Sequence, residues 1–333
     1  MTARTTVAEA TVAGVGLVVP PAGLARGAAW FDYRTRLGPR GYKYLPDACQ
    51  YLLAAAREAM GSPGGEVMTQ LLAEERRAAV VGTNSAVAPL HAEIEETVRQ
   101  DGIRLLSPMT TPFFSVNLVA AKLSTEHGIK GSNLTLTSER VAGVQALHVA
   151  AQQLAEGRCD VVLAGATEAA DPLCGTATPE EGAALFMLRP REAGTTADSA
   201  SLRTALCFLP PAALDRAAGR ERARHAVCAA LDALHAPSLP ASGLASVRLV
   251  TDASPVAAAV ETSVRAWCGT RASVTTKLSG PRAGALAPVE LLARALRADG
   301  PGAHLVVVAG RSGNAALALI RTPDTADSTA PRP

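Results

Sequence analysis

The pattern of apolar and polar positions is clearest between residues 133 and 168, and the rest of the chain is organised around this stretch. Residues 134–138 read as a short strand, and residues 139–140 form a tight turn. Apolar residues at helical spacing then run from about 143 to 156 and end at a glycine. An apolar run at 161–164, next to another glycine, is typical of a buried strand. The pattern predicts the order strand, turn, helix, strand.

The turn between the first strand and the helix is where this pattern would place a nucleophile. Free N–H groups and the macrodipole at a helix N-terminus favour negative charge and would lower the pKa of a thiol. The turn holds Glu139 and Arg140 instead. An arginine cannot attack a carbonyl carbon, and a cation has the unfavourable sign at this end of a helix. The stretch therefore has the form of a catalytic turn without its nucleophile.

The same kind of patterning continues along the chain as an alternation of strands and helices. The predicted strands are 11–19, 78–83, 134–138, 161–164, 183–188, 202–209, 247–251, 273–276, 304–309 and 315–320. The predicted helices are 47–60, 91–100, 116–127, 143–156, 215–234, 256–267 and 288–298. Such alternation favours mostly parallel sheets covered by helices, which places the chain in the α/β class.

A polar segment rich in small residues, at 190–200, interrupts this alternation and indicates a junction between two halves. The two halves repeat the order of strands and helices weakly, without a fixed sequence period. We therefore predict an N-terminal half at 1–190, a C-terminal half at 201–322 and a disordered tail at 323–333.

Composition excludes several classes of function. The 333 residues carry 32 basic and 30 acidic side chains, a net charge of +2, which gives no reason to expect nucleic acid or a membrane as a partner. The six cysteines show no C-x-x-C spacing and no partnering with histidines, so we predict neither a metal site nor a cofactor. The N-terminus lacks the pattern of a signal peptide, and no apolar run approaches the roughly 18 residues of a membrane span. We expect a cytoplasmic protein.

The residues around the turn resemble a known catalytic motif. In the nucleophile elbow of β-ketoacyl synthases a cysteine lies three residues before a glycine that matches Gly143, and Arg140 occupies that position in this chain. The stretch is more similar still to chain-length factors, the ketosynthase β subunits of type II polyketide synthases. Those subunits have a Glu-Gln pair where this chain has Glu139-Arg140. The resemblance therefore does not extend to a glutamine-based decarboxylation.

The resemblance also implies catalytic histidines at other positions, and all are replaced. β-Ketoacyl synthases use two histidines to polarise the thioester carbonyl and to stabilise the charge left by decarboxylation. Asp252, in L-V-T-D-A-S-P, stands where the first is expected, and Ala316, in G-N-A-A-L, where the second is expected. Pro281 stands where the family has the histidine of a Gly-His pair. We therefore predict no catalytic residue in this chain.

A segment before the elbow, S-P-M-T-T-P-F-F-S-V-N at 107–117, is similar to the part of chain-length factors that places bulky side chains into the acyl tunnel. By position, the resemblance implies that Met109, Phe113 and Phe114 line this tunnel. The alternative is that the two phenylalanines are ordinary core residues, and the sequence leaves both interpretations open.

The resemblance covers the chain from about 11 to 320 and implies a thiolase-like fold, with two pseudo-symmetric halves in a five-layered α-β-α-β-α arrangement. It also implies a heterodimer in which the strand before the elbow pairs across the dimer axis; left unpaired, this strand would be an association hazard. The implied interface residues are Leu134, Thr135, Leu136, Thr137, Ser138, Glu139 and Arg140. Arg140 is expected to pair with Glu139 or with a carboxylate of the partner, or else to face solvent.

The leading hypothesis is a non-catalytic, chain-length-factor-like subunit that pairs with an active ketosynthase α subunit and shapes its acyl tunnel. The second implied partner is an acyl carrier protein with a phosphopantetheine-bound acyl chain. One alternative is a ketosynthase-like homodimer with rewired acyl hydrolase or decarboxylase activity at Ser138 or Cys174, for which no motif places an activating histidine. Another is a scaffold that binds the carrier protein without shaping products.

Overall fold

The computed structural model describes residues 6–25, 28–61, 72–108, 111–174, 180–191, 199–235, 244–269, 273–278, 284–298 and 302–322. The strands are β1 (Val7–Val18), β2 (Arg77–Gly82), β3 (Asn133–Leu136), β4 (Val161–Glu168), β5 (Gly182–Arg189), β6 (Ser201–Phe208), β7 (Ser246–Thr251), β8 (Val274–Leu278), β9 (Gly302–Ala309) and β10 (Asn314–Thr322). The helices are α1 (Tyr33–Arg36), α2 (Asp47–Met60), α4 (Ala88–Asp101), α5 (Leu118–Glu126), α6 (Ala142–Ala155), α7 (Ala217–His235), α8 (Pro255–Cys268) and α9 (Leu286–Arg297). Five short 3₁₀ turns are η1 (Glu74–Arg76), η2 (Ile103–Leu105), η3 (Thr111–Phe113), η4 (Glu139–Val141) and η5 (Pro211–Ala213).

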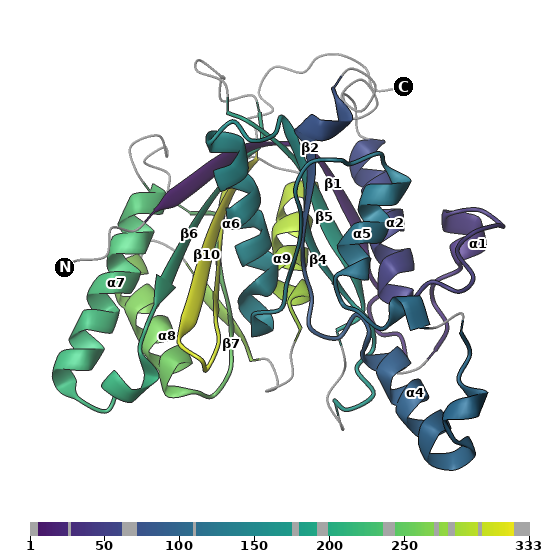
Figure 1. Ribbon diagram of the computed structural model, residues 1–333. Coiled ribbons are helices and arrows are strands. Elements are labelled where there is room, and N and C mark those ends of the chain that lie inside the picture. The colour runs from purple at the N-terminus through teal and green to yellow at the C-terminus, as the bar shows by residue number, and fades with distance from the viewer. Residues whose placement is uncertain are drawn as a thin grey trace.

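The strands of the two halves follow the same order (Figure 1). The first half reads β3-β2-β4-β5-β1 and the second reads β8-β7-β9-β10-β6, counted from the outer edge inward. In each half the three outermost strands are parallel to one another. The fourth strand, β5 or β10, runs antiparallel to the third. The halves are joined where Val7–Thr11 pairs antiparallel with Ser201–Ala205, which makes one ten-stranded sheet. The predicted pseudo-symmetry of the two halves is therefore confirmed.

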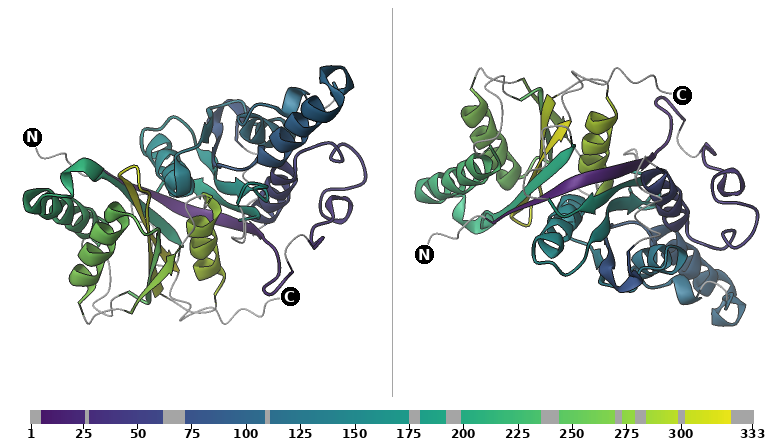
Figure 2. Two further views of the ribbon diagram at one scale, coloured as in Figure 1. Left: turned by 90° about the horizontal axis from the view of Figure 1, so that it is seen from below. Right: turned by 90° about the horizontal axis from the view of Figure 1, so that it is seen from above.

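Three separate apolar cores define five layers. Helices α6 and α9 pack in a central core between the strands of both halves. Helices α2 and α5 cover the outer face of the first half, and α7 and α8 cover the outer face of the second. Figure 2 shows α6 and α9 on opposite sides of β1, each on the side of its own half. The predicted α/β class and the five-layered arrangement are confirmed.

The predicted division at 190 and 201 and the tail at 323–333 stay predictions, since 192–198 and 323–333 lie outside the described residues. Strand β4 is longer than the predicted 161–164, and all of its residues are buried. The polar end of β4 remains in the sheet because its side chains find partners inside the protein. Thr167 Oγ1, for example, donates to the carbonyl oxygens of Ala48 (2.8 Å) and Gly182 (3.0 Å).

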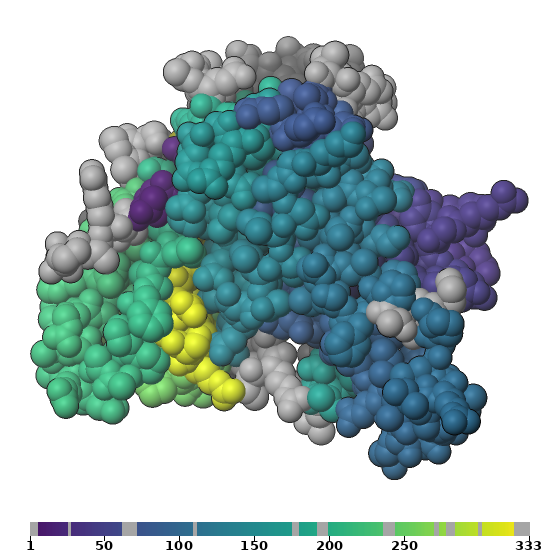
Figure 3. Space-filling model, in the orientation of Figure 1, coloured from purple at the N-terminus to yellow at the C-terminus, as the bar shows by residue number. Residues whose placement is uncertain are grey.

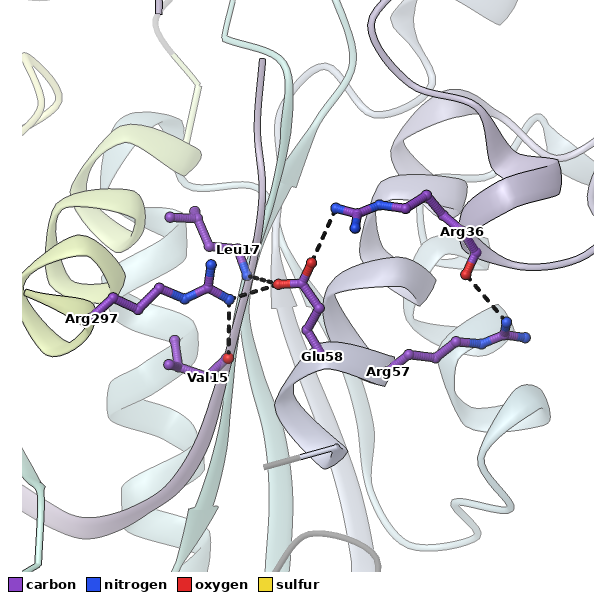
Figure 4. A network of polar contacts seen from close by, with 6 residues as sticks. All are labelled: Val15, Leu17, Arg36, Arg57, Glu58 and Arg297. Atoms are coloured by element: carbon purple, nitrogen blue, oxygen red, sulfur yellow. Dashed lines mark hydrogen bonds and ion pairs between the residues drawn. The ribbon is translucent and has the colours of Figure 1, made fainter. Parts of the chain in front are cut away.

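Part of β1 has a strand on one side only, because its pairing with β6 stops at Thr11. Two long side chains bond to its open edge (Figure 4). The Leu17 N–H donates to Glu58 Oε2 (3.0 Å), and Arg297 Nη2 donates both to that carboxylate oxygen (2.6 Å) and to the Val15 carbonyl (3.3 Å). Arg36 donates to the other oxygen of the Glu58 carboxylate (3.1 Å). This network ties α2 on the outer face to α9 in the central layer.

Candidate functional site

The elbow has the predicted geometry. Strand β3 ends at Leu136, η4 forms the turn, and α6 begins at Ala142. Glu139 has φ of +49°, and among the described residues it is the only non-glycine residue with a positive φ. This left-handed backbone is costly for a residue with a side chain, so the surroundings must hold it. Asn84 does so from the end of β2, because its Nδ2 donates to the Glu139 carbonyl (2.6 Å).

Two glycines let the elbow pack closely against its neighbours. A Cβ on Gly82, at the end of β2, would lie 2.5 Å from the Ala142 carbonyl carbon. A Cβ on Gly143 would lie 2.3 Å from the carbonyl oxygen of Ala285, directly before α9. Both separations are far below van der Waals contact, so only glycine fits. The starts of α6 and α9 therefore meet at the centre of the molecule.

Arg140, at the position where the resemblance predicts a nucleophile, is buried inside the protein. Its side chain is 3% exposed, and its Nη1 lies 3.3 Å from Oδ2 of Asp252, which is 10% exposed. Asp252 directly follows β7 in the other half. Two of the three positions predicted to be degenerate thus face each other as an ion pair. Burial excludes the solvent-facing alternative.

Removing two charges from water is costly, so this pair must be held by its surroundings. Loss of one partner of a buried pair typically costs about 3–5 kcal/mol, because the other charge is left uncompensated. The contact also joins the N-terminal half to the C-terminal half. It places two paired charges at the positions where the resemblance predicts a nucleophile and a first histidine.

The Glu139 carboxylate points to the turn between β9 and β10. Ser312 Oγ donates to Glu139 Oε2 (3.4 Å), and Asn314 Nδ2 donates to Ser312 Oγ (3.2 Å). The third degenerate position, Ala316, is buried in β10 and belongs to the central core. Ala316 contributes no polar side chain there. Pro281 lies outside the described residues.

A second polar cluster, which sequence reasoning missed, lies at the start of α9. The fully buried Glu168 carboxylate, at the end of β4, accepts bonds from the loop after β2 and from the backbone before α9. Its donors are Thr83 Oγ1 (3.1 Å), Asn84 N (3.0 Å), Ser85 N (2.6 Å), Ser85 Oγ (2.7 Å) and Ala285 N (2.6 Å). Charge-assisted bonds of this kind are about twice as strong as neutral ones. Glu168 therefore fixes the loops on both sides of the elbow.

Glu180 lies close to Glu168 at the same helix end. Its Oε2 accepts from the N–H groups of Leu286 (3.0 Å) and Ala287 (3.1 Å). Burial, and then the negative charge of Glu168, raise the pKa of Glu180 to about 8. The two backbone bonds and the charge of Lys277 act in the opposite direction. Glu180 is therefore protonated at neutral pH, which avoids two adjacent negative charges.

The implied tunnel residues behave differently from one another. Met109 lies outside the described residues. Phe113 is half-buried and packs against the outer core under α2 and α5, as in the ordinary-core interpretation. Phe114 is 57% exposed, and its ring centroid lies 4.5 Å from that of His91. Adjacent phenylalanines thus point to the interior and to the surface.

The implied interface stretch starts at an open sheet edge. Strand β3 is the outermost strand of its half, and Leu134 is 39% exposed. At the other end of the stretch, Arg140 is only 2% exposed. Interface membership of all these residues stays a prediction.

The elbow helix carries one histidine, and the structure places it in the interior. His148, two turns into α6, is buried, and its Nδ1 lies 3.0 Å from Thr204 Oγ1. Burial lowers the pKa of His148, which is the pattern of a packed core histidine. Cys174 is half-buried. Over the described ranges, no group of three or more His, Cys, Asp or Glu side chains is arranged to hold a metal, and no helix is long and apolar enough to cross a membrane.

Sequence comparisons point to one family. The profile described as "Beta-ketoacyl synthase, N-terminal domain" matches residues 20–192. The 3-oxoacyl-(acyl-carrier-protein) synthase 2 of Vibrio cholerae is 29% identical over 160 residues, which are 47% of this chain and 36% of that enzyme. The chloroplastic 3-oxoacyl-(acyl-carrier-protein) synthase I of Arabidopsis thaliana is 28% identical over 129 residues, which are 38% of this chain and 27% of that enzyme. The matched segment thus spans about a third of the length of these curated relatives.

Solved structures share the fold at low identity. The structure described as the ishigamide ketosynthase/chain length factor gives a TM-score of 0.68 at 19% identity, covering 95% of this chain and 99% of that chain. A type II polyketide synthase acyl carrier protein in complex with its ketosynthase bound to the hexaketide gives 0.68 at 16% identity, covering 95% of this chain and 100% of that chain. Likeness at such identity shows the fold alone, which is the expected thiolase-like ketosynthase fold.

Proposed function

Because the chain belongs to the β-ketoacyl synthase N-terminal domain family, we propose that it is a non-catalytic subunit similar to chain-length factors. In this role it pairs with an active ketosynthase α subunit and shapes the tunnel that receives the growing acyl chain. The acyl chain is delivered on an acyl carrier protein.

The buried Arg140–Asp252 pair is the observation that carries this proposal. Condensation needs a nucleophile to take up the acyl group and donors that stabilise an oxyanion. A guanidinium is not a nucleophile, and an ionised carboxylate donates no hydrogen bond. The pairing of these two side chains at the elbow supports the proposal that the chemistry comes from another subunit.

The two outer edges of the sheet support pairing through the N-terminal half. Both β3 and β8 are end strands. Strand β8 carries the exposed Lys277, a residue that typically protects an edge against association, whereas β3 reads N-L-T-L and exposes Leu134. We therefore infer that β3 is the edge that meets the partner subunit.

A projecting arm, defined here as α4, η2 and the described residues from there to Phe114, supports the same conclusion. Figure 3 shows its α4 portion extending from the body of the molecule. No side chain of α4 is buried. Large apolar side chains on the arm are exposed: Val98 (43%), Ile103 (73%), Leu105 (66%) and Phe114 (57%). Apolar side chains gathered on one projection are typical of a protein–protein contact.

A basic segment around α1 supports a carrier protein as the second partner. Arg34, Arg40 and Lys43 are exposed within a few turns of chain that also carry the exposed Tyr44. Lys43 lies over the Tyr44 ring, 5.2 Å from its centroid. Positive side chains beside an aromatic ring favour an acidic protein surface. The phosphopantetheine arm would then be delivered at the partner ketosynthase.

Co-purification tests the proposal. The tagged chain is co-expressed with ketosynthase α subunits from its host genome, and the mass of the eluted complex is measured. We expect a one-to-one heterodimer that condenses acyl units, while the chain alone forms no condensation product. Leu134→Lys should reduce recovery of the heterodimer at least tenfold, whereas Lys277→Leu, the matched change on the opposite edge, should leave it unchanged. A homodimer that ignores every ketosynthase, or condensation by the chain alone, would overturn the proposal.

A further inference from the structure

Two contacts join Phe114 to His91. His91 lies in the first turn of α4, and its Nε2 is 2.8 Å from the carbonyl oxygen of Phe114. A carbonyl oxygen only accepts, so Nε2 must carry the hydrogen and donate it. The two rings are also in contact, with centroids 4.5 Å apart. His91 therefore contacts both the backbone and the ring of Phe114.

His91 is itself tied to the centre of the molecule. The loop before α4 donates the N–H groups of Asn84 and Ser85 to the buried Glu168 carboxylate. The His91 N–H then donates to the Val87 carbonyl (3.0 Å) in the turn that starts α4. The start of the arm is thus fixed to the interior, although the rest of the arm projects outward.

An exposed phenylalanine ordinarily samples several rotamers, because no packing selects one of them. Phe113 needs no such support, since the outer core holds it. For Phe114 the His91 ring covers one side and the backbone bond fixes the Cα, while 57% of the residue remains open to a partner or ligand. The arm therefore presents one aromatic side chain in a defined orientation.

We propose that His91 is a positioning residue that holds Phe114 in the orientation in which it limits the length of the acyl chain. This inference rests on the proposed function, since the acyl chain meets Phe114 only in the complex with a ketosynthase. Phe114 sets the limit by its bulk, and His91 makes the limit sharp by preventing rotation of the ring. His91 touches no reacting atom.

Product length in the reconstituted heterodimer tests both statements. Phe114→Ala should shift the dominant product to longer chains, and Phe114→Trp to shorter ones. His91→Ala should keep the heterodimer and its total yield but spread the products over at least two additional elongation steps. His91→Phe keeps the ring without the hydrogen bond, and His91→Gln keeps a donor without the ring. Each should therefore give a product-length distribution narrower than that of His91→Ala and broader than that of the parent chain. His225→Ala, an exposed histidine on α7, is the matched control and should behave as the parent chain.

A second measurement does not depend on a partner. The chain has five phenylalanines, so incorporation of 4-fluorophenylalanine gives few fluorine resonances, and Phe114→Leu identifies the one from position 114. His91→Ala should shift that resonance and narrow it as the ring gains freedom, and His225→Ala should not. An unchanged Phe114 resonance in His91→Ala overturns the positioning role, whatever the products are.

The two failures are distinguishable. If the Phe114 variants assemble normally and leave product length unchanged, Phe114 does not limit the acyl chain. That part of the proposed function is then overturned. If the Phe114 variants shift the length but His91→Ala gives the sharp product distribution of the parent chain, only the role of His91 is overturned.

Discussion

The two helices of the central layer start in opposite electrostatic environments. Helix α9 begins at Leu286, where the carboxyl groups of Glu168 and Glu180 accept bonds from the N–H groups at and before its first turn. Helix α6 begins at the equivalent place in the other half, and the residue close to its start is the cation Arg140. Acidic groups stabilise a helix N-terminus, and cations destabilise it.

Carboxyl groups from the opposite half meet both helix starts, but only at α9 do they bond to the N–H groups of the helix, whereas at α6 the carboxylate pairs with a cation. At α9 the helix itself supplies the donors that the carboxyl groups need. At α6 the compensation comes from Asp252, which reaches across from the second half. Both starts therefore depend on the packing of the two halves against each other. Asp252 of the second half reaches the elbow, and Glu168 and Glu180 of the first half reach the start of α9.

Separating the Arg140–Asp252 pair should have the largest effect on stability. Arg140→Met or Asp252→Leu each leaves one buried charge without its partner, so each should lower the free energy of unfolding by about 3–5 kcal/mol. The double variant should lose less than either single variant, because no uncompensated charge remains. Urea unfolding of the four chains gives the coupling energy. Additive losses would show that the two charges do not compensate each other.

Replacing the carboxylate of Glu168 should have the next largest effect. Glu168→Gln keeps the size of the side chain but turns an amide group toward donors, which should cost about 3 kcal/mol. Glu261→Gln is the matched control, since Glu261 pairs with Arg265 on the exposed face of α8 and such pairs contribute about 0–1 kcal/mol. Urea unfolding again measures both. Equal losses would contradict the assigned role of Glu168.

The smallest expected effect is a dependence of stability on pH that is caused by the titration of Glu180. Its folded-state pKa of about 8 is above the ordinary value of 4.5, so the folded chain binds a proton that the unfolded chain has released. The contribution of Glu180 to the free energy of unfolding is therefore fully present below about pH 4.5 and is lost as the pH rises through 8. Glu180→Gln should flatten the melting temperature between pH 6 and pH 9 relative to the parent chain. Glu221→Gln, on the exposed face of α7, is the control, and its melting temperature should fall with pH as that of the parent chain does. If the melting temperature of Glu180→Gln falls in the same way, Glu180 is not the titrating group.

Much of the fold follows from local pattern. The alternation of strands and helices, the elbow between β3 and α6, and the degenerate position of Arg140 are readable in the sequence because each depends on neighbouring residues. The resemblance to β-ketoacyl synthases then supplied the five layers, which periodicity alone does not fix.

The pairings across the molecule were not readable in this way. Arg140 and Asp252 lie in different halves, and their contact depends on how β3 and β7 are brought together. The burial of Glu168 had one local signal, a carboxylate at the end of an otherwise apolar run, but its donors come from two segments that are far apart in the sequence. Phe113 and Phe114 illustrate the same limit, since identical neighbours differ only in the direction that the backbone gives them.

The contacts along the open edge of β1 have a consequence for how the molecule avoids joining to others in the wrong place. The Glu58 carboxylate accepts from Leu17 as the carbonyl of a neighbouring strand would, and the Arg297 guanidinium donates to Val15 as an amide would. The two side chains together imitate one residue of a strand that is not there. A strand from another molecule would have to displace Glu58 and Arg297 before it could pair with β1 between the two halves. The middle of the sheet is therefore protected against association, while the outer edge at β3 stays open for the proposed partner.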